Sequence, residues 1–446
     1  MNALLRFVTH PARLVPLAFL ATIIVGTVLL SLPIATAGPT RPPVLTAAFT
    51  SVSAVCVTGL ITVDTATYWS PFGQAVILGL IQVGGFGIMT LATLLTMLVG
   101  GRLGLRSSLV AQAETHTLNL GDTRHVLRRV AITMLSFETL IAIALILRFR
   151  VRYDDTWAEA TWHGVFHAIS AFNNAGFALY SDNLIGFVAD AWIMVPLSVA
   201  IVAGGLGFPV LFELRRAWRA SKRWSIHTRL TLYGTMILLA FGVTAFLVLE
   251  WSNAETIGPL GTGGKAVASL FGGVVPRTAG FNSVDYGQVT PETLAINYGL
   301  MFIGGGSAGT AGGIKVTTFF LLAFVIWSEL RGERDTNIGH RRISPHTLRQ
   351  ALTVVLLAIG AIAAGTMVIL LATDYTLDVV LFEAISAFAT VGLSTGITYD
   401  LPPVAELTLM ALMFVGRVGT ITVATGLALK KRHHHYHLPE ERPIVG

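Results

Sequence analysis

Residues 382–392 read FEAISAFATVG, and two other parts of the chain repeat this pattern. The copies are FHAISAFNNAG at residues 166–176 and FTSVSAVCVTG at residues 49–59, each with an aromatic residue ten positions before a glycine and a Ser-Ala pair midway. Residues 270–280 keep the spacing but read LFGGVVPRTAG, without that pair. The four glycines are 117, 104 and 112 residues apart, so the chain is predicted to contain one structural unit four times.

The composition of the 446-residue chain is typical of a membrane protein. It has 53% hydrophobic residues, 12% charged residues and a mean hydropathy of +0.70, whereas soluble proteins carry about 25% charged residues. So little charge cannot cover the surface of a soluble globule, and so much apolar content excludes a disordered chain. Cys56 is the single cysteine, which excludes an intrachain disulfide. The composition therefore predicts a polytopic membrane protein.

Eight apolar stretches are long enough to cross a bilayer as helices, which takes about 20 residues. They are residues 14–32, 73–99, 130–147, 191–212, 230–249, 293–326, 351–371 and 406–429. The first stretch is too long for a secretory signal, so we expect it to be retained as a span. Each pair of spans flanks a shorter segment whose length is typical of a re-entrant helix: 46–57, 162–173, 266–275 and 378–389.

These elements predict an all-α polytopic membrane protein with four pseudo-symmetric span–pore helix–span repeats around a central ion pore. All four repeats cross the membrane in the same sense, so they are parallel repeats about an axis along the membrane normal. We expect them to cover residues 12–112, 124–222, 225–338 and 345–432, followed by a cytoplasmic tail at residues 433–446.

The distribution of charge predicts the orientation. The two termini and the loops near residues 100–129, 213–229 and 329–349 hold 22 Lys and Arg residues against 8 Asp and Glu. The segments on the other side hold 6 Lys and Arg residues against 15 Asp and Glu. The remaining charged residues, Glu138, Lys315 and Arg417, are placed at membrane depth. Because basic loops stay in the cytoplasm, both termini are expected inside. The net charge of +6 thus indicates a membrane-flanking collar rather than a nucleic-acid surface.

The glycine that ends each short segment predicts an ion filter. Non-helical backbone at membrane depth is tolerated where it lines a water- or ion-filled cavity, and rings of carbonyls replace the hydration shell of potassium in known filters. Glycine lets such carbonyls turn inward at little steric cost. Helix termination or packing is the alternative role, and four matched copies favour the filter. The predicted filter residues are Val57, Thr58, Gly59, Asn174, Ala175, Gly176, Thr278, Ala279, Gly280, Thr390, Val391 and Gly392.

These segments, together with the Phe or Leu after each glycine, resemble the Trk/Ktr/HKT superfamily of potassium transporters over nearly the whole chain, and the number of spans is most similar to the KtrB branch. The resemblance implies potassium uptake across the inner (cytoplasmic) membrane, with K+ at the filter carbonyls and one pore in each protomer of a homodimer. It also implies a KtrA-like ring of cytosolic nucleotide-binding regulatory subunits.

A glycine-rich run interrupts the sixth apolar stretch: residues 304–313 read GGGSAGTAGG. Each glycine in a helix costs about 1 kcal/mol relative to alanine, so a loop is expected here. Its GxGxxG string lacks the strand and βαβ unit of a dinucleotide site. Close helix packing is one interpretation, and a gate beneath the filter, which the resemblance supports, is the other. The predicted gate residues are Gly304, Gly305, Gly306, Ser307, Ala308, Gly309, Thr310, Ala311, Gly312, Gly313, Lys315 and Arg417.

Arg417 stands where the first two repeats have Gly85 and Gly205. An arginine within the membrane is costly and usually functional. We expect it to place a fixed positive charge below the filter and to bond to the loop carbonyls, Ser307 or Thr310. The resemblance implies that this arginine acts as an electrostatic barrier to cations. The alternative is an arginine that is paired for structural reasons.

Three other features have two interpretations each. Glu138 is expected to be a hydrogen-bonded structural carboxyl, with a proton or ion site as the alternative. The run His433–His437 is expected to be an exposed tail rather than a metal site. Four acidic residues follow the filter glycines and either concentrate cations at the pore entrance or lie in ordinary solvated loops: Asp64, Asp182, Asp285 and Asp400.

The function that the sequence favours is a potassium-conducting pore subunit. A sodium- or proton-coupled cation symporter is the main alternative, and the preference for K+ over Na+ stays open at this point. An intramembrane enzyme is disfavoured, because the chain offers no nucleophile triad, phosphate loop or metal-ligand cluster. No covalent cofactor is expected.

Overall fold

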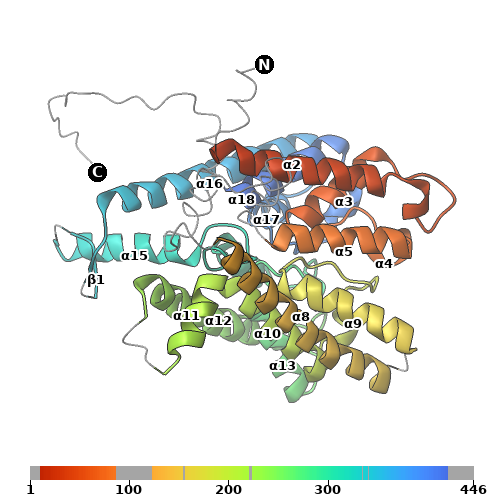
Figure 1. Cartoon of the computed structure of the whole chain (residues 1–446), viewed down its shortest axis with the longest axis horizontal. Helices are drawn as coiled ribbons and strands as arrows, with labels where there is room; N and C mark the ends of the chain where they lie inside the picture. Colours follow the sequence, from red (N-terminus) through yellow and green to blue (C-terminus); the bar gives the residue numbers. More distant parts are fainter. Residues whose placement is uncertain are drawn as a thin grey trace.

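A computed structural model describes residues 11–86, 123–153, 156–219, 224–333, 335–339 and 341–419. These residues form a mostly helical assembly (Figure 1). The predicted tail at residues 433–446, the last part of the predicted fourth repeat and most of the loop near residues 100–129 lie outside the described residues.

Three kinds of helix follow one another four times along the chain. The first kind comprises α2 (Pro11–Leu30), α8 (Thr123–Arg152), α12 (Ile226–Glu250) and α16 (Pro345–Ala372). The second kind is shorter and comprises α3 (Val44–Val55), α9 (Trp157–Phe172), α13 (Thr262–Val274) and α17 (Leu377–Phe388). The third comprises α5 (Pro71–Gly85), α10 (Ala191–Leu206), α14 (Pro291–Phe302) and α18 (Pro403–Val418). The short helices coincide with the segments predicted to be re-entrant.

The remaining elements are connections. They are η1 (Pro33–Ala35), α4 (Thr65–Tyr68), η2 (Ile185–Phe187), α11 (Phe208–Ala217), α15 (Val316–Leu330), η4 (Ile397–Asp400) and a two-stranded antiparallel hairpin of β1 (Asn337–Ile338) and β2 (Arg341–Arg342). Figure 1 shows α15 and the hairpin at one end of the molecule, away from α4.

Side-chain hydroxyls fix where several helices begin. Ser70, Thr156, Ser225, Thr290 and Ser344 each accept a hydrogen bond from the backbone N–H three residues later. Such N-caps satisfy one of the free N–H groups of the first turn. Proline, which needs no N–H bond there, also stands in the first turn of α5, α14 and α16. The first residues of these helices are therefore determined by the local sequence.

The contacts between helices close a ring. Each first helix packs on the short helix that follows it, in the pairs α2–α3, α8–α9, α12–α13 and α16–α17. Each third helix packs on the short helix of the next unit, in the pairs α5–α9, α10–α13 and α14–α17, and α18 returns to α3. In this cyclic order each short helix packs between helices of its own unit and the third helix of the preceding unit.

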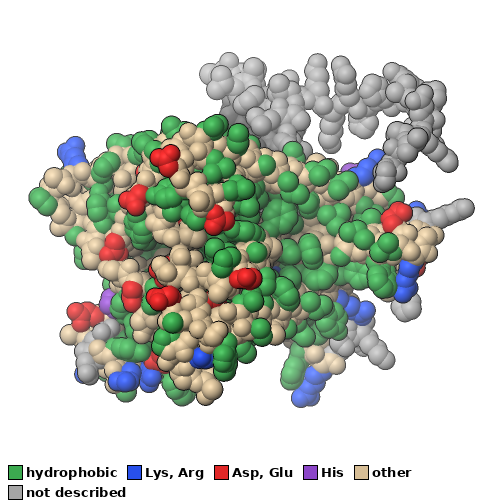
Figure 2. All heavy atoms as spheres, turned by 180° about the vertical axis from the view of Figure 1, so that it is seen from behind, with side chains coloured by type: hydrophobic (Ala, Val, Ile, Leu, Met, Phe, Trp, Pro, Cys, Tyr) green, Lys and Arg blue, Asp and Glu red, His purple; other side chains and the backbone are tan. Residues whose placement is uncertain are grey.

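The outer helices turn apolar side chains away from the centre. Leu140 on α8, Val248 on α12 and Leu371 on α16 are each 65–77% exposed. Figure 2 shows hydrophobic side chains over much of one face, and most of its acidic side chains in the half away from α15 and the hairpin. A large apolar outer surface with segregated charge is what a bilayer-embedded protein presents.

Two predicted spans are not continuous helices. Within the described residues, three helices are long and apolar enough to cross a membrane, or four if α10 and α11 form one bent span. The predicted span at residues 191–212 is a bent pair of helices, because the helix axis turns by 99° at Gly207, whose φ is +90°. The stretch at residues 293–326 is broken between α14 and α15, where the predicted loop lies.

Candidate functional site

The four segments that follow the short helices have one unusual backbone pattern. The glycine of each segment has a φ between +71° and +96°, and the residue two positions earlier also has a positive φ, between +50° and +70°. Those earlier residues are Val57, Asn174, Thr278 and Thr390. A left-handed conformation costs an L-residue about 1–2 kcal/mol, so four matched outliers need a common structural cause.

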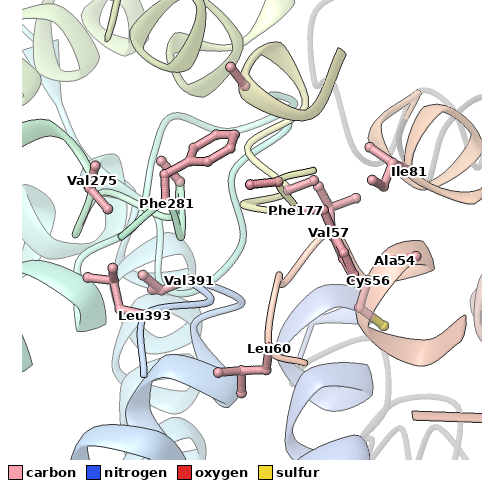
Figure 3. Packing of buried hydrophobic residues seen from close by; sticks show 14 of the residues in the cluster. Ala54, Cys56, Val57, Leu60, Ile81, Phe177, Val275, Phe281, Val391 and Leu393 are labelled. Carbon is pink, nitrogen blue, oxygen red and sulfur yellow. The ribbon is translucent and has the colours of Figure 1, made fainter. Parts of the chain in front are cut away.

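That common cause is convergence of the four glycines. We call residues 57–59, 174–176, 278–280 and 390–392 the glycine ring. A Cβ atom built on Gly59 would lie within 3.0 Å of the carbonyl oxygen of Ala175. The same relation holds from Gly176 to Ala279, from Gly280 to Val391 and from Gly392 to Thr58. The carbonyl before each glycine thus meets the glycine of the preceding unit, and the cycle closes. The apolar residue that follows each glycine is buried beside it: Leu60, Phe177, Phe281 and Leu393 (Figure 3).

Serines in the short helices hold two of the four glycines. The Oγ of Ser53 accepts a hydrogen bond from the N–H of Gly59 at 3.1 Å, and Ser386 does the same for Gly392 at 3.1 Å. Ser170 occupies the same place in the second unit, but its hydroxyl donates to the carbonyl of Phe177 at 2.8 Å. The Ser-Ala pair of the repeated pattern therefore supports the glycine ring.

The third segment is built differently. Val274 stands where the other units have the serine, so no hydroxyl can reach Gly280 from that position. Arg277, which charge counting assigns to an outer loop, is instead 6% exposed and donates from Nη2 to the carbonyl of Gly304 at 2.6 Å. Neither this burial nor this contact is predicted by counting charges, because a backbone carbonyl acceptor can belong to any residue type.

The glycine-rich run forms a loop that is tied at its base. Ile303 and Ile314 form a β-bridge, and the N–H of Gly304 donates to the carbonyl of Ile314 at 2.7 Å. The N–H of Gly306 donates to Gly205 at 2.7 Å, at the end of α10. Thr310 donates from its hydroxyl to the carbonyl of Phe172, the last residue of α9, at 3.1 Å.

The loop also packs against the fourth unit. A Cβ atom on Gly312 would lie within 3.0 Å of the hydroxyl of Thr390. The predicted loop is therefore present: its glycines allow close packing, and its packing partners include residues of the ring segments. Ser307, by contrast, pairs with the hydroxyl of Thr317 at 3.3 Å rather than with Arg417.

Arg417 links the loop to the first unit. Its Nη1 donates to the carbonyl of Thr310, and its Nη2 donates to the carbonyl of Gly84 at 2.8 Å, at the end of α5. The side chain is 7% exposed. Lys315 binds its own loop, donating to the carbonyl of Ala311 at 2.7 Å. Both cations thus bond to backbone of the loop, as expected for Arg417.

Glu138 is the centre of a buried amide network. One carboxylate oxygen accepts from Gln82 at 3.0 Å and the other from Asn173 at 3.0 Å, while the side chain is 4% exposed. Asn173 caps α9 and also donates to the oxygen of Gln82 at 3.1 Å. Both oxygens are therefore occupied by structural partners, which favours the structural interpretation of Glu138 over an ion site.

Two buried titratable residues were missed by the sequence analysis. His167 and Glu383 stand at the same position, nine residues before the ring glycine of their units. Nε2 of His167 accepts the N–H of Leu179 at 3.3 Å, and Glu383 accepts that of Thr395 at 3.0 Å, each three residues after the glycine. Glu383 also accepts from the hydroxyls of Ser394 and Thr398. Their shared register in the aligned repeats was a usable signal.

The four acidic residues beyond the ring have local partners or face solvent. Asp64 caps α4 and accepts from Ser181 at 2.6 Å. Asp182 and Asp285 accept backbone N–H groups in turns, and Asp400 is exposed. Within the described parts of the chain, no group of three or more His, Cys, Asp or Glu side chains could hold a metal ion. The histidines of the tail lie outside those parts.

The helix ring, its four converging glycine segments and its apolar outer face define a helical membrane protein of the class in which re-entrant helices surround a central axis. Residues 17–435 match the TrkH family of cation transport proteins. The chain belongs to this family, which is a family of transporters and not of enzymes.

Several relatives resemble the chain over nearly its whole length. Ktr system potassium uptake protein B of Bacillus subtilis (strain 168) is 38% identical over 436 residues, covering 98% of this chain and 97% of that protein. The potassium/sodium uptake protein NtpJ of Enterococcus hirae is 33% identical over 447 residues, with coverages of 98% and 97%. Among solved structures, the potassium transporter TrkH of Vibrio parahaemolyticus has the same fold, with a TM-score of 0.72, 17% identity and coverages of 92% and 84%.

Proposed function

We propose that the chain takes up potassium through the axis of the helix ring, with the glycine ring as its filter. The observation that carries this proposal is the cyclic contact of the four carbonyls of Thr58, Ala175, Ala279 and Val391 with the glycines of the neighbouring units. Carbonyls held in this way replace the waters that a potassium ion sheds. The related Ktr system proteins are named for potassium uptake, and NtpJ for potassium or sodium.

We further propose that residues 304–313, with Lys315 and Arg417, gate this path. The loop has direct neighbours in the second and fourth units, at Phe172 and Thr390, and Arg417 joins it to Gly84 of the first. A segment with partners in so many units lies near their common axis. Its two cations add a positive charge that opposes the passage of potassium.

The proposed setting is the cytoplasmic membrane, with both termini inside. The excess of basic residues at the termini and in three loops supports this orientation. We also propose that the chain forms a homodimer. A KtrA-like ring of nucleotide-binding regulatory subunits is proposed to dock on its inner loops. A hollow of about 520 Å³ between the end of α15 and the hairpin, lined in part by Trp327 and Arg331, offers a surface for such a subunit.

The test of this function is the reversal potential of the purified protein in liposomes. Ion flow through a uniport pore is expected to follow the potassium gradient alone, because the carbonyls exchange only the ion's water shell. Under a tenfold potassium gradient, the reversal potential should stay fixed when sodium or pH is varied. A reversal potential that moves with sodium or pH would support the alternative, a coupled symporter, and no potassium flux in folded protein would contradict the proposal.

A further inference from the structure

The third segment of the glycine ring has no hydroxyl support from its own short helix. In the first and fourth segments a serine accepts the N–H of the ring glycine, at Ser53 and Ser386. The first, second and fourth segments also share a backbone bond that spans five residues, such as Thr58 N–H to Ser53 and Val391 N–H to Ser386. In the third segment the corresponding N–H, that of Ala279, reaches back only to Val275.

Arg277 supplies a different connection at this place. It directly precedes Thr278, whose φ is +70°, and its Nη2 donates to the carbonyl of Gly304 at 2.6 Å. Its side chain is 6% exposed, and Nε and Nη1 have no hydrogen-bond partner among the described residues. A buried guanidinium is costly, so this single bond to the loop is a specific contact rather than a solvated surface contact.

Gly304 is the fixed base of the 304–313 loop. Its N–H bonds to Ile314, and the carbonyl of Gly305 accepts the N–H of Val316 at 3.0 Å, so both stems are joined where Arg277 binds. Arg417 binds six residues further on, at Thr310. The two arginines therefore hold different parts of the loop, and only Arg277 is itself next to a ring residue.

We propose that Arg277 is a positioning residue that holds the third ring segment by tying it to the base of the 304–313 loop. The guanidinium of Arg277 then couples the ion selectivity of the filter to the position of the 304–313 loop. This inference rests on the proposed potassium pore, because it concerns the accuracy of the filter within that pore. It assigns to Arg277 the supporting role that the short-helix serines have in the first and fourth units.

The test compares Arg277→Met, Arg277→Lys and the double variant Arg277→Met with Val274→Ser. The permeability ratio of potassium to sodium, obtained from reversal potentials in liposomes, reports the filter, and basal flux reports the loop. Arg277→Met is expected to lower the ratio about tenfold, since it removes a hydrogen bond from a charged donor, and to raise basal flux. Arg277→Lys keeps one charged donor and should stay near the wild-type ratio.

The double variant separates the two roles. Val274→Ser supplies the missing hydroxyl, so it is expected to restore part of the ratio while basal flux stays high. Arg349→Met, on the exposed face of α16, is the matched control and should change neither quantity. Should Arg277→Met fail to fold, as judged by gel filtration and thermal unfolding, Arg277→Gln replaces it and is judged by the same ratio.

A wild-type ratio in folded Arg277→Met or Arg277→Gln would overturn the inference, whether or not basal flux rises. A rise in flux at an unchanged ratio would make Arg277 a part of the gate alone. Failure of the proposed function looks different: the wild-type protein itself would carry no selective potassium current, whatever Arg277 does.

Discussion

Gly392→Ala is expected to abolish selective potassium flux, reducing it by at least about a hundredfold. The alanine methyl would lie within 3.0 Å of the carbonyl oxygen of Thr58, at a φ of +96° that L-residues rarely adopt. Either the fourth segment or the neighbouring carbonyl has to move, and a displaced carbonyl no longer faces the ion. A hundredfold loss of flux corresponds to about 2.8 kcal/mol, because each 1.4 kcal/mol is a factor of ten.

The measurement is potassium and sodium flux into liposomes at equal protein content. Gly360→Ala is the matched control, because it lies on the exposed side of α16 with no atom within 4 Å of the added methyl, and alanine favours the helix. Folded Gly392→Ala protein with wild-type flux and selectivity would show that the ring does not contact the ion.

Arg417→Met is expected to raise basal potassium flux about tenfold while leaving selectivity near the wild-type value. The change removes two hydrogen bonds from a charged donor, to Thr310 and Gly84, each worth about 1.5–3 kcal/mol. It also removes a positive charge near the ion path. Methionine is close in length and apolar, so the buried volume remains filled.

The flux of Arg417→Met is compared with that of Arg417→Lys, which keeps the charge but has a single donor centre. An intermediate flux for the lysine variant indicates that both the charge and the forked bonding contribute. Lower or unchanged flux in folded Arg417→Met would remove Arg417 from the gate and leave it as a structural arginine.

The repeat and its glycines were predictable because the distances between matching residues can be counted directly in the sequence. The aromatic residue, the Ser-Ala pair and the glycine recur at fixed distances, and the short helices lie where those segments predict. The glycine run of residues 304–313 was also visible, since so many glycines cannot form a regular helix within a long apolar stretch. The functional roles predicted for these residues await the experiments above.

Other features involve contacts between distant parts of the chain. At the bend at Gly207, the N–H of Phe208 bonds to the carbonyl of Ala308 in the 304–313 loop at 3.2 Å. The partner of Arg277 is a backbone carbonyl, which any residue type provides, so neither its burial nor its contact could be inferred from composition. His167 and Glu383 could have been found, because comparing the four aligned segments position by position exposes two titratable residues in one register.

The central claim is that main-chain oxygens from the four segments of the glycine ring coordinate a dehydrated monovalent cation. Anomalous diffraction from crystals soaked in thallium or rubidium, which substitute for potassium, tests it most directly. We predict a peak on the axis enclosed by Gly59, Gly176, Gly280 and Gly392, within direct coordination distance of the Thr58, Ala175, Ala279 and Val391 carbonyls. Ions bound elsewhere in the protein, with none at the ring in a folded and conducting preparation, would contradict the account.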